Sequence, residues 1–400
     1  MTYLIIGNGV AGNAAAESIR KYDPQGKIVM FSRESRPFYY VPALPEYVAG
    51  EKAADQIIIH RQNWYDQHGI DLYLDTRVTK IDPDQKFVET DQGARFFFDK
   101  LLLATGGNSF VPPLPGADAP GVFTLRTLAD ADRLKQKAAQ AKTAVLIGGG
   151  LLGLEAGNGL RKLGLKVVVV EFFPRLLPRQ MDVPGAAILA RQMEDLGFTF
   201  YLGAKTREIV TGPDGLQVCL ESGEKLKGEL VLISAGVRPD LVLAQALGLD
   251  IDKGVKVDDT MKTSRDDVYA AGDLIEHRGR FYGIWPAALE QGRVAGAAMA
   301  GQAATYAGTL PSNVLKVVGI DLVAAGDIDA DGKLKAIVHT DAAQKTYRKL
   351  VMQDNRLVGA ILLGDIRGSA EIQAAIQKQQ DVSLLKDELA QPDFDFKRLR

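Results

Sequence analysis

The sequence predicts an α/β fold in which two parallel sheets each open with a glycine-rich turn. The two turns, Gly7–Gly12 and Gly148–Gly153, share the spacing G-x-G-x-x-G. Each follows a short apolar run and precedes an alanine- or leucine-rich stretch, which is the strand–turn–helix context of a Rossmann-like dinucleotide site. One such motif is weak evidence because glycine-rich turns are common. Two in one chain predict two dinucleotides that exchange something, and electrons are the obvious candidate.

The composition is typical of a soluble globular protein with two or three domains. The chain has 400 residues, of which 46% are hydrophobic and 24% charged, with a formal net charge of −2. So small a charge indicates neither nucleic acid nor an anionic membrane as the main partner. No apolar run approaches the roughly 18 residues that span a membrane. Because the first strand begins within a few residues of Met1, we expect no signal peptide and a cytoplasmic location.

Cysteine and histidine usage argues against a metal centre. Cys219 is the only cysteine, and the 4 histidines form no CxxC, HExxH or Cys/His cluster. We therefore expect no intrinsic iron–sulfur, zinc or haem site. A single cysteine cannot form an internal disulfide. Because Cys219 lies in an apolar, strand-like stretch, we expect it to be a small buried hydrophobic residue.

Residues 1–107 and 142–236 follow one plan, which we interpret as an internal duplication of architecture. Each runs through a strand, a glycine turn, a helix, a second strand, a small β layer and a last strand that ends in glycines. A strand over Lys27–Phe31, directly after a helix over Asn13–Lys21, requires a parallel sheet. Short alternating runs are suited to antiparallel strands at 71–74, 86–90 and 95–98.

Between and after these two halves the pattern changes. Val111–Gly116 is interpreted as a linker, since its prolines cannot pair in a central sheet. A strand with a terminal Gly-Asp is expected over Val268–Asp273, and a strong helix over Ala287–Ala300.

The last part of the chain is expected to form a separate α+β layer. Residues 311–378 alternate as strands and close with a helix over Ser369–Gln380, for which Ser369 is a plausible N-cap. The tail, 393–400, has no period, so we expect it to be frayed and solvated or docked on a partner.

A carboxylate ends the strand that follows the second fingerprint. Glu171 can accept from two ribose hydroxyls and would repel a 2′-phosphate, so NADH is favoured over NADPH. Arg175 and Arg179 follow closely and can soften that preference. The alternative is that Glu171 merely ends a strand. Glu155, in the first turn of the helix, is either a surface residue stabilised by the helix dipole or a contact of the nicotinamide.

The strand after the first fingerprint does not end in an acidic residue. Ser32 ends this strand, and Glu34 follows two residues later. We expect Glu34 to bind the ribose, and Ser32 can bind one hydroxyl itself.

Several motifs in order resemble those of the FAD-dependent pyridine-nucleotide oxidoreductases. Beside the two fingerprints, they are Ala104-Thr105-Gly106, Gly236–Pro239, Ala270–Asp273 and Trp285–Gly292. The resemblance covers residues 1 to about 378. It implies FAD on the first fingerprint and NAD(P)H on the second. It also implies two three-layer α/β domains and a C-terminal α+β interface domain, with the FAD domain discontinuous over 1–110 and 239–310, the NAD(P)H domain over 111–238 and the interface domain over 311–400.

The resemblance also implies roles for single residues. Asp273 would accept from the ribityl hydroxyls of FAD, while a helix starting near Pro286 would aim its positive end at the flavin edge, favouring the anionic reduced flavin by about 0.3–2 kcal/mol. The expected FAD contacts are Gly7, Gly9, Val10, Ala11, Gly12, Ser32, Glu34, Pro42, Ala104, Thr105, Gly106, Gly272, Asp273, Trp285, Ala287 and Ala288. The expected NADH contacts are Gly148, Gly150, Leu151, Leu152, Gly153, Glu155, Glu171, Arg179 and Gly236.

The sequence departs from the family at one informative position. Members that reduce disulfides or peroxide carry a cysteine before a small residue, Leu and Pro in the loop over the flavin, and here Pro42 stands at that position. Cys219 belongs to the other half and cannot replace it, so we expect no thiol mechanism. The loop around Pro42 resembles that of rubredoxin reductases and of the flavin domain of assimilatory nitrite reductases. Residues 313–322 and 357–365 resemble their C-terminal domain.

The sequence therefore predicts an NADH-dependent flavin enzyme that passes electrons to a small carrier such as rubredoxin or a related iron–sulfur protein. Position, dipole and exclusion of water would carry the reaction without an acid–base residue. Three alternatives remain open: a flavin NADH oxidase that forms hydrogen peroxide, a flavoprotein component of a larger reductase such as nitrite reductase, and a non-enzymatic flavoprotein that responds to NADH. The protein is expected to be a monomer or a homodimer.

Overall fold

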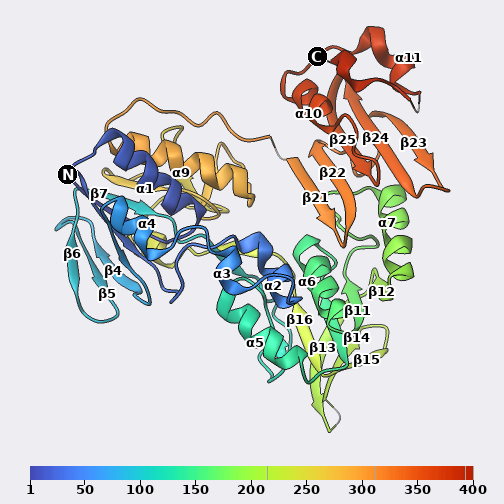
Figure 1. Cartoon of the computed structure of the whole chain (residues 1–400), viewed down its shortest axis with the longest axis horizontal. Coiled ribbons are helices and arrows are strands. Elements are labelled where there is room, and N and C mark those ends of the chain that lie inside the picture. The colour runs from blue at the N-terminus through green and yellow to red at the C-terminus, as the bar shows by residue number, and fades with distance from the viewer. Residues whose placement is uncertain (214, 311, 392, 400) are drawn as a thin grey trace. The chain divides into compact units, whose positions relative to one another are not determined.

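The computed structural model describes residues 1–213, 215–310, 312–391 and 393–399, and it divides into two compact units (Figure 1). Unit 1 is discontinuous and comprises Met1–Ala43, Ala53–Phe110 and Val237–Thr309. Unit 2 comprises Leu44–Lys52, Val111–Gly236 and Leu310–Arg400. The finer division into four segments at 110, 238 and 310 stays a prediction.

Unit 1 is built on a five-stranded parallel sheet with the order β19-β7-β1-β2-β3. Helix α1 (Val10–Tyr22) connects β1 to its parallel neighbour β2. Because every neighbouring pair in this sheet is parallel, the carboxyl ends of all five strands lie at one edge. The central strand, β1, is apolar over Leu4–Ile6, and Leu4 and Ile5 are completely buried. The strands are β1 (Thr2–Ile6), β2 (Lys27–Phe31), β3 (Ile70–Tyr73), β7 (Lys100–Leu103) and β19 (Val268–Ala270).

Strand β3 corrects one prediction. Residues 71–74 are not an antiparallel strand, because β3 pairs in parallel with β2 and places Ile70 opposite Ile28. The long connection between the two strands, which contains α4 (Gln62–Gln67), supplies the crossover that parallel pairing needs. The other two alternating runs are confirmed as part of an antiparallel sheet of β4 (Val78–Asp82), β5 (Phe87–Thr90) and β6 (Arg95–Phe97).

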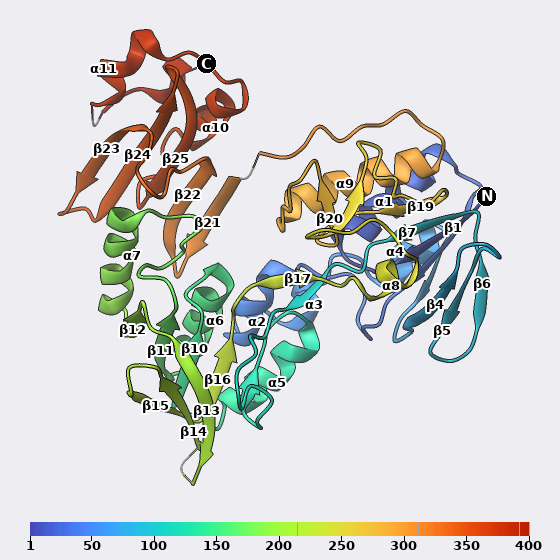
Figure 2. The same cartoon turned by 180° about the vertical axis from the view of Figure 1, so that it is seen from behind.

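Helix α9 (Trp285–Met299) lies directly against α1, and Figures 1 and 2 show the two side by side from both directions. A Cβ on Gly292 would come within 3.0 Å of the carbonyl oxygen of Ala11, and one on Gly296 would meet that of Ala15. Two glycines one turn apart therefore let the two backbones touch. The remaining elements of unit 1 are α3 (Ala54–Ile57), α8 (Val242–Ala246), η1 (Val41–Ala43), β8 (Gly107–Ser109), β17 (Val237–Pro239), β18 (Val255–Val257) and β20 (Ile275–His277).

The same plan recurs in unit 2, as the sequence predicts. Its five-stranded parallel sheet has the order β12-β11-β10-β16-β9, with α6 (Leu151–Lys162) connecting β10 to β11. The strands are β9 (Val122–Phe123), β10 (Thr143–Ile147), β11 (Lys166–Glu171), β12 (Phe198–Leu202) and β16 (Leu230–Ile233). Beside this sheet lies a small antiparallel sheet of β13 (Thr206–Gly212), β14 (Gly215–Leu220) and β15 (Lys225–Gly228). The helices of this part, apart from α6, are α2 (Leu44–Val48), α5 (Leu128–Ala138) and α7 (Val183–Asp195).

The C-terminal part of unit 2 is an antiparallel sheet with the order β21-β22-β25-β24-β23, covered by α10 (Ser369–Gln377). Ser369 is the first helical residue and not the N-cap, which is Gly368 with φ 76°. The strands are β21 (Ser312–Val317), β22 (Ile320–Gly326), β23 (Lys335–Asp341), β24 (Thr346–Gln353) and β25 (Arg356–Leu363), and the short helices are η2 (Ser383–Leu385), α11 (Lys386–Leu389) and η3 (Phe396–Leu399).

The tail is not frayed within the part of it that the structure describes, 393–399. Phe394, Phe396 and Leu399 are each at most 8% exposed and join the core of the C-terminal sheet. Three apolar side chains spaced along the tail contribute enough burial to hold it on its own domain. Among the described residues, no helix is both long and apolar enough to cross a membrane.

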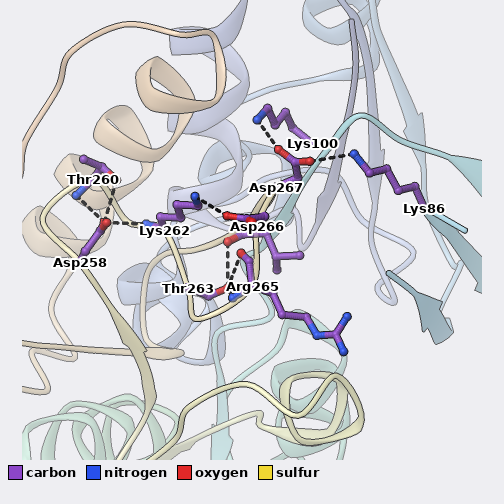
Figure 3. Close-up of polar contacts among 10 residues, drawn as sticks. Lys86, Lys100, Asp258, Thr260, Lys262, Thr263, Arg265, Asp266 and Asp267 are labelled. Atoms are coloured by element: carbon purple, nitrogen blue, oxygen red, sulfur yellow. Dashed lines mark hydrogen bonds and ion pairs between the residues drawn. The ribbon is translucent and has the colours of Figure 1, made fainter. Parts of the chain in front are cut away.

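A polar cluster ties the amino-terminal edge of the unit 1 sheet together (Figure 3). The carboxylate of Asp267, just before β19, lies 2.7 Å from Lys86 Nζ and also accepts from Lys100, the first residue of β7. Its neighbour Asp266 pairs instead with Lys262, four residues away, and is 91% exposed. The bonds from Lys100 and Lys86 lower the pKa of Asp267 to about 2.

We expect Asp267→Asn to lower the free energy of unfolding by about 1 kcal/mol at neutral pH. Because the pKa of Asp267 in the folded chain is lowered to about 2, its contribution is complete above the unfolded value of about 3.9. It is lost as the pH falls from there towards about 2. Denaturant titrations at several pH values measure this. Asp266→Asn is the matched control and should change little; equal effects of the two variants would contradict the prediction.

Candidate dinucleotide sites

The three glycines of the first fingerprint have different surroundings and different structural roles. Gly7 follows β1 with φ 121°, and a Cβ there would collide with the carbonyl of Ala104. A Cβ on Gly12 would collide with the carbonyl of Gly7, so α1 can rest on the turn only because this residue has no side chain. Gly9 differs, since no described heavy atom lies within 4 Å of its Cβ position. The turn thus leaves open space at Gly9, where the diphosphate of a ligand could approach the protein backbone.

The amino end of α1 is available to an anion. Gly9 is the N-cap, and among the described residues no side chain caps the helix and no acidic residue lies in its first turn. Its first N–H groups therefore keep their partial positive charge. The Nδ2 group of Asn8 is buried and has no hydrogen-bond partner in the described chain. Open space, free helical donors and an orphaned amide together fit a bound diphosphate.

Sequence reasoning missed the side chains that hold this turn. Asn13 Nδ2 donates to Asn8 Oδ1 over 2.8 Å, and the hydroxyl of Tyr65 lies 2.8 Å from the same oxygen. Burial raises the pKa of Tyr65 to about 12, so its hydroxyl stays protonated and can donate. The two asparagines lie in or beside the motif and could be suspected from it. Nothing in the sequence links Tyr65 to the turn.

The expected contacts at the end of β19 lie close to the same helix end. The N–H of Gly272 donates to Gln291 Oε1 over 3.0 Å, and a Cβ on Gly272 would lie 3.1 Å from that of Ala11 and 3.8 Å from that of Ala288. Asp273, the next residue, is therefore placed where α1 and α9 begin. Within the described chain α9 also lacks a side-chain cap, and Pro286 occupies its first turn.

Ser32 and Glu34 follow β2 at the carboxyl edge of the sheet. Ser32 is buried, and its Oγ accepts from the N–H of Glu34 over 3.2 Å. Glu34 also accepts a hydrogen bond from the Tyr39 hydroxyl over 2.7 Å. Thr105, from the Ala-Thr-Gly motif, donates to the carbonyl of Asp240 over 3.1 Å. That Glu34 binds a ribose, with Ser32 able to bind one of its hydroxyls, stays a prediction.

The loop with the missing cysteine is rich in aromatic contacts. Pro42 is exposed in η1. Nearby, Phe38 stacks on Trp285 with ring centroids 5.7 Å apart, and Tyr40 meets the same indole edge-on at 4.9 Å. The expected flavin-side tryptophan is thus held by this loop.

The second fingerprint repeats the geometry of the first. Gly148 has φ 118°, and its Cβ would collide with the carbonyl of Ser234, while a Cβ on Gly153 would meet that of Gly148. In the described structure no atom lies within 4 Å of the Cβ position of Gly150, the N-cap of α6, and no side chain caps that helix. The expected contacts Leu151 and Leu152 form the first turn of α6. This end also fits a diphosphate.

Glu171 ends β11 beside this turn. It is 6% exposed, and its two oxygens accept from the N–H groups of Gly149 at 2.5 Å and Phe173 at 2.8 Å. Arg175 is committed to the loop itself, donating to the carbonyls of Met181 and Pro178. Arg179, in contrast, is exposed. Both arginines are expected to soften the NADH preference, but the guanidinium of Arg175 is occupied by these two carbonyls and that of Arg179 is exposed to solvent.

Glu155 is not a simple surface residue. Its Oε1 accepts from the backbone N–H of Val318 over 2.8 Å, so it binds the C-terminal segment of the chain. Burial raises the pKa of Glu155 above its ordinary value. Gly236, expected on the same ligand, has φ 105°, and no described atom crowds its Cβ position. Whether Glu155 touches a nicotinamide stays a prediction.

Cys219 lies in β14, is 3% exposed and is confirmed as a buried apolar residue. Among the described residues, no three His, Cys, Asp or Glu side chains lie close enough together to share a metal ion.

We expect Gly9→Ala and Gly150→Ala to leave folding intact but weaken dinucleotide binding. Both glycines have negative φ values that alanine accepts, and both face open space. The added methyl would occupy the approach of the diphosphate, so affinity should fall about tenfold or more for the fingerprint that is changed. Bound dinucleotide per chain and the melting temperature measure the two effects. Gly12→Ala is the contrasting variant. Because its methyl would collide with the carbonyl of Gly7, it should lower the melting temperature, which Gly9→Ala and Gly150→Ala should not.

Comparisons with known proteins agree with this geometry. A family model described as pyridine nucleotide-disulphide oxidoreductase matches residues 1–292, and one described as the rubredoxin NAD+ reductase C-terminal domain matches residues 311–380. The assimilatory nitrate reductase electron transfer subunit of Bacillus subtilis is 36% identical over 98% of this chain, which spans about half (51%) of that relative's length. The NADH-rubredoxin oxidoreductase of Clostridium acetobutylicum is 30% identical, with 94% of each chain covered.

Among solved structures, the covalent putidaredoxin reductase–putidaredoxin complex contains a chain that matches with a TM-score of 0.90 and 25% identity, covering 100% of this chain and 97% of that one. The family model spans both fingerprints, and the C-terminal model begins just after the last segment of unit 1, which ends at Thr309. The chain belongs to the pyridine nucleotide-disulphide oxidoreductase family, whose members use FAD and NADH.

Proposed function

We propose that this chain takes electrons from NADH and passes them, through FAD, to a small one-electron carrier such as rubredoxin or a related iron–sulfur protein. The observation that carries the proposal is the position of the single cysteine. Pro42 stands where thiol-dependent members carry cysteine, and Cys219 is buried in a strand of unit 2. Electrons that reach the flavin would therefore leave for an acceptor other than a thiol of the described chain. The match of residues 311–380 to a rubredoxin reductase domain supports such a carrier.

FAD, when bound, converts the electron pair of a hydride donor into single electrons for a one-electron acceptor. The chain supplies the binding. The uncapped end of α1 and the space at Gly9 would hold the FAD diphosphate, while Asp273 would accept from the ribityl hydroxyls. The amino end of α9 would place partial positive charge near the flavin.

NADH would be held at the second fingerprint by the same means. The amino end of α6 and the space at Gly150 would take its diphosphate, and Glu171 would accept from the adenosine ribose. Both oxygens of Glu171 already accept a backbone N–H, which fixes the carboxylate in one orientation and keeps lone pairs for hydroxyls.

An acceptor screen with the FAD-loaded protein tests the proposal. NADH should bleach the flavin rapidly under anaerobic conditions; air should reoxidise it slowly and rubredoxin quickly. Fast turnover in air with peroxide as product would identify an NADH oxidase instead. A flavin that is reduced but turns over with no acceptor would indicate a non-enzymatic, NADH-responsive role, and either result would contradict the proposal.

A second candidate is the electron-entry module of a larger reductase. It is favoured by the higher identity, 36%, to relatives named as nitrate and nitrite reductase components, of which this chain spans about half. Tagged full-length chain that copurifies with a metal-bearing partner, and reduces it with NADH, would select this candidate over a freely diffusing carrier.

We expect Glu171→Gln to raise kcat/KM for NADPH relative to NADH by about tenfold, because a buried carboxylate repels a 2′-phosphate and an amide does not. Steady-state rates with both nucleotides and a fixed artificial acceptor measure the ratio. Glu194→Gln, an exposed residue of α7, is the matched control and should leave the ratio as in the native chain. An unchanged ratio in Glu171→Gln would remove this carboxylate from nucleotide selection.

A further inference from the structure

A buried polar network joins the C-terminal sheet to α7 of unit 2. Asp182, the N-cap of α7, accepts from the Gly185 N–H through Oδ1 and from the Tyr347 hydroxyl through Oδ2 at 2.6 Å. Lys349 Nζ lies 3.3 Å from the same Oδ2 and donates to the carbonyl of Asp329 over 2.7 Å. Asp182, Tyr347 and Lys349 are 5%, 1% and 5% exposed. Charges buried this deeply are costly unless each is paired, as these are.

Asp182 is also the last residue of the loop that follows Glu171. This loop, 172–182, has no helix or strand of its own. Arg175 pulls it together by donating to the carbonyls of Pro178 and Met181, the residue before Asp182. Met181 donates its N–H to the carbonyl of Leu177 over 2.9 Å and is fully buried. The end of the loop that Asp182 anchors is therefore bonded to its middle.

The middle of the loop rests on the second fingerprint. The N–H of Leu177 donates to the carbonyl of Gly149 over 3.0 Å, and a Cβ on Gly149 would lie 2.9 Å from Leu176 Cδ2. The N–H of Gly149 in turn donates to Glu171. A continuous set of bonds thus runs from β24, through Asp182 and the loop, to the turn and the carboxylate that face the nucleotide.

We propose that Tyr347 and Lys349 are positioning residues for NADH: by fixing Asp182 they fix loop 172–182 and, through it, the cradle formed by Gly149 and Glu171. The inference rests on the proposed function, in which the second fingerprint holds NADH. It gives the C-terminal domain a part in nucleotide affinity, although neither residue need touch the nucleotide.

The geometry also supplies a control. At the other end of α7, Lys345 Nζ pairs with Asp195 over 2.7 Å, with side chains 51% and 63% exposed. This pair joins α7 to the residue just before β24. Among the described residues, neither side chain has a hydrogen bond or ion pair with loop 172–182. A contact that merely docks the domain and one that positions the loop can therefore be removed separately.

The test uses the FAD-loaded, full-length protein with Tyr347→Phe, Asp182→Asn and Lys345→Ala. Tyr347→Phe keeps the ring and removes only the hydroxyl, and Asp182→Asn keeps an N-cap while removing the charge that faces Lys349. For both we expect the half-saturating NADH concentration for flavin reduction to rise about tenfold, with the limiting rate within about twofold of native. Lys345→Ala should bind NADH as the native chain does.

Hydrogen exchange without NADH gives an independent readout. The amides of Leu177 and Met181 should exchange faster in Tyr347→Phe than in Lys345→Ala. Native NADH affinity and native exchange in Tyr347→Phe would overturn the inference, even if its melting temperature fell. A native protein whose flavin NADH cannot reduce would instead overturn the proposed function, and the inference with it.

Discussion

Direct contact between backbones is the constraint on which the rest of this structure depends. At each fingerprint a glycine sits on a carbonyl of the neighbouring strand end, and a second glycine lets the helix rest on the turn. Gly292 and Gly296 repeat the device between α9 and α1. Because side chains are absent at these points, helix ends come to lie within reach of the sheet edge. The uncapped N–H groups that this exposes are what make the edge an anion site.

Features set by local sterics could be predicted from the sequence. The glycine spacing requires a turn, an open position and a close approach, and all three are found at Gly7, Gly9 and Gly12. The duplicated plan, the buried Cys219 and the helix at α9 follow equally from short-range pattern. Their common property is that a few neighbouring residues determine the outcome, so no knowledge of distant contacts is needed.

Features that depend on distant partners could not be predicted. An alternating run such as 71–74 can pair in either direction, and only the long crossover decides that β3 is parallel. The tail carries three apolar side chains whose burial depends on a surface built by α10 and the C-terminal sheet. Glu155 binds Val318, and Asp182 binds Tyr347, across more than 160 positions in each case. Polar residues that meet at such separations leave no periodic signal.

The pairing of β19 with β7 has a consequence for the order in which the protein forms on the ribosome. Residues 268–270 complete an edge of a sheet whose other strands all lie before position 104. The parallel sheet of unit 2 needs no strand beyond residue 233, so all of its strands are synthesised before that edge strand emerges. Until then β7 presents an unpaired, apolar edge to the cell. The nascent chain therefore exposes this edge to mispairing, and to chaperones, until residues 268–270 have emerged.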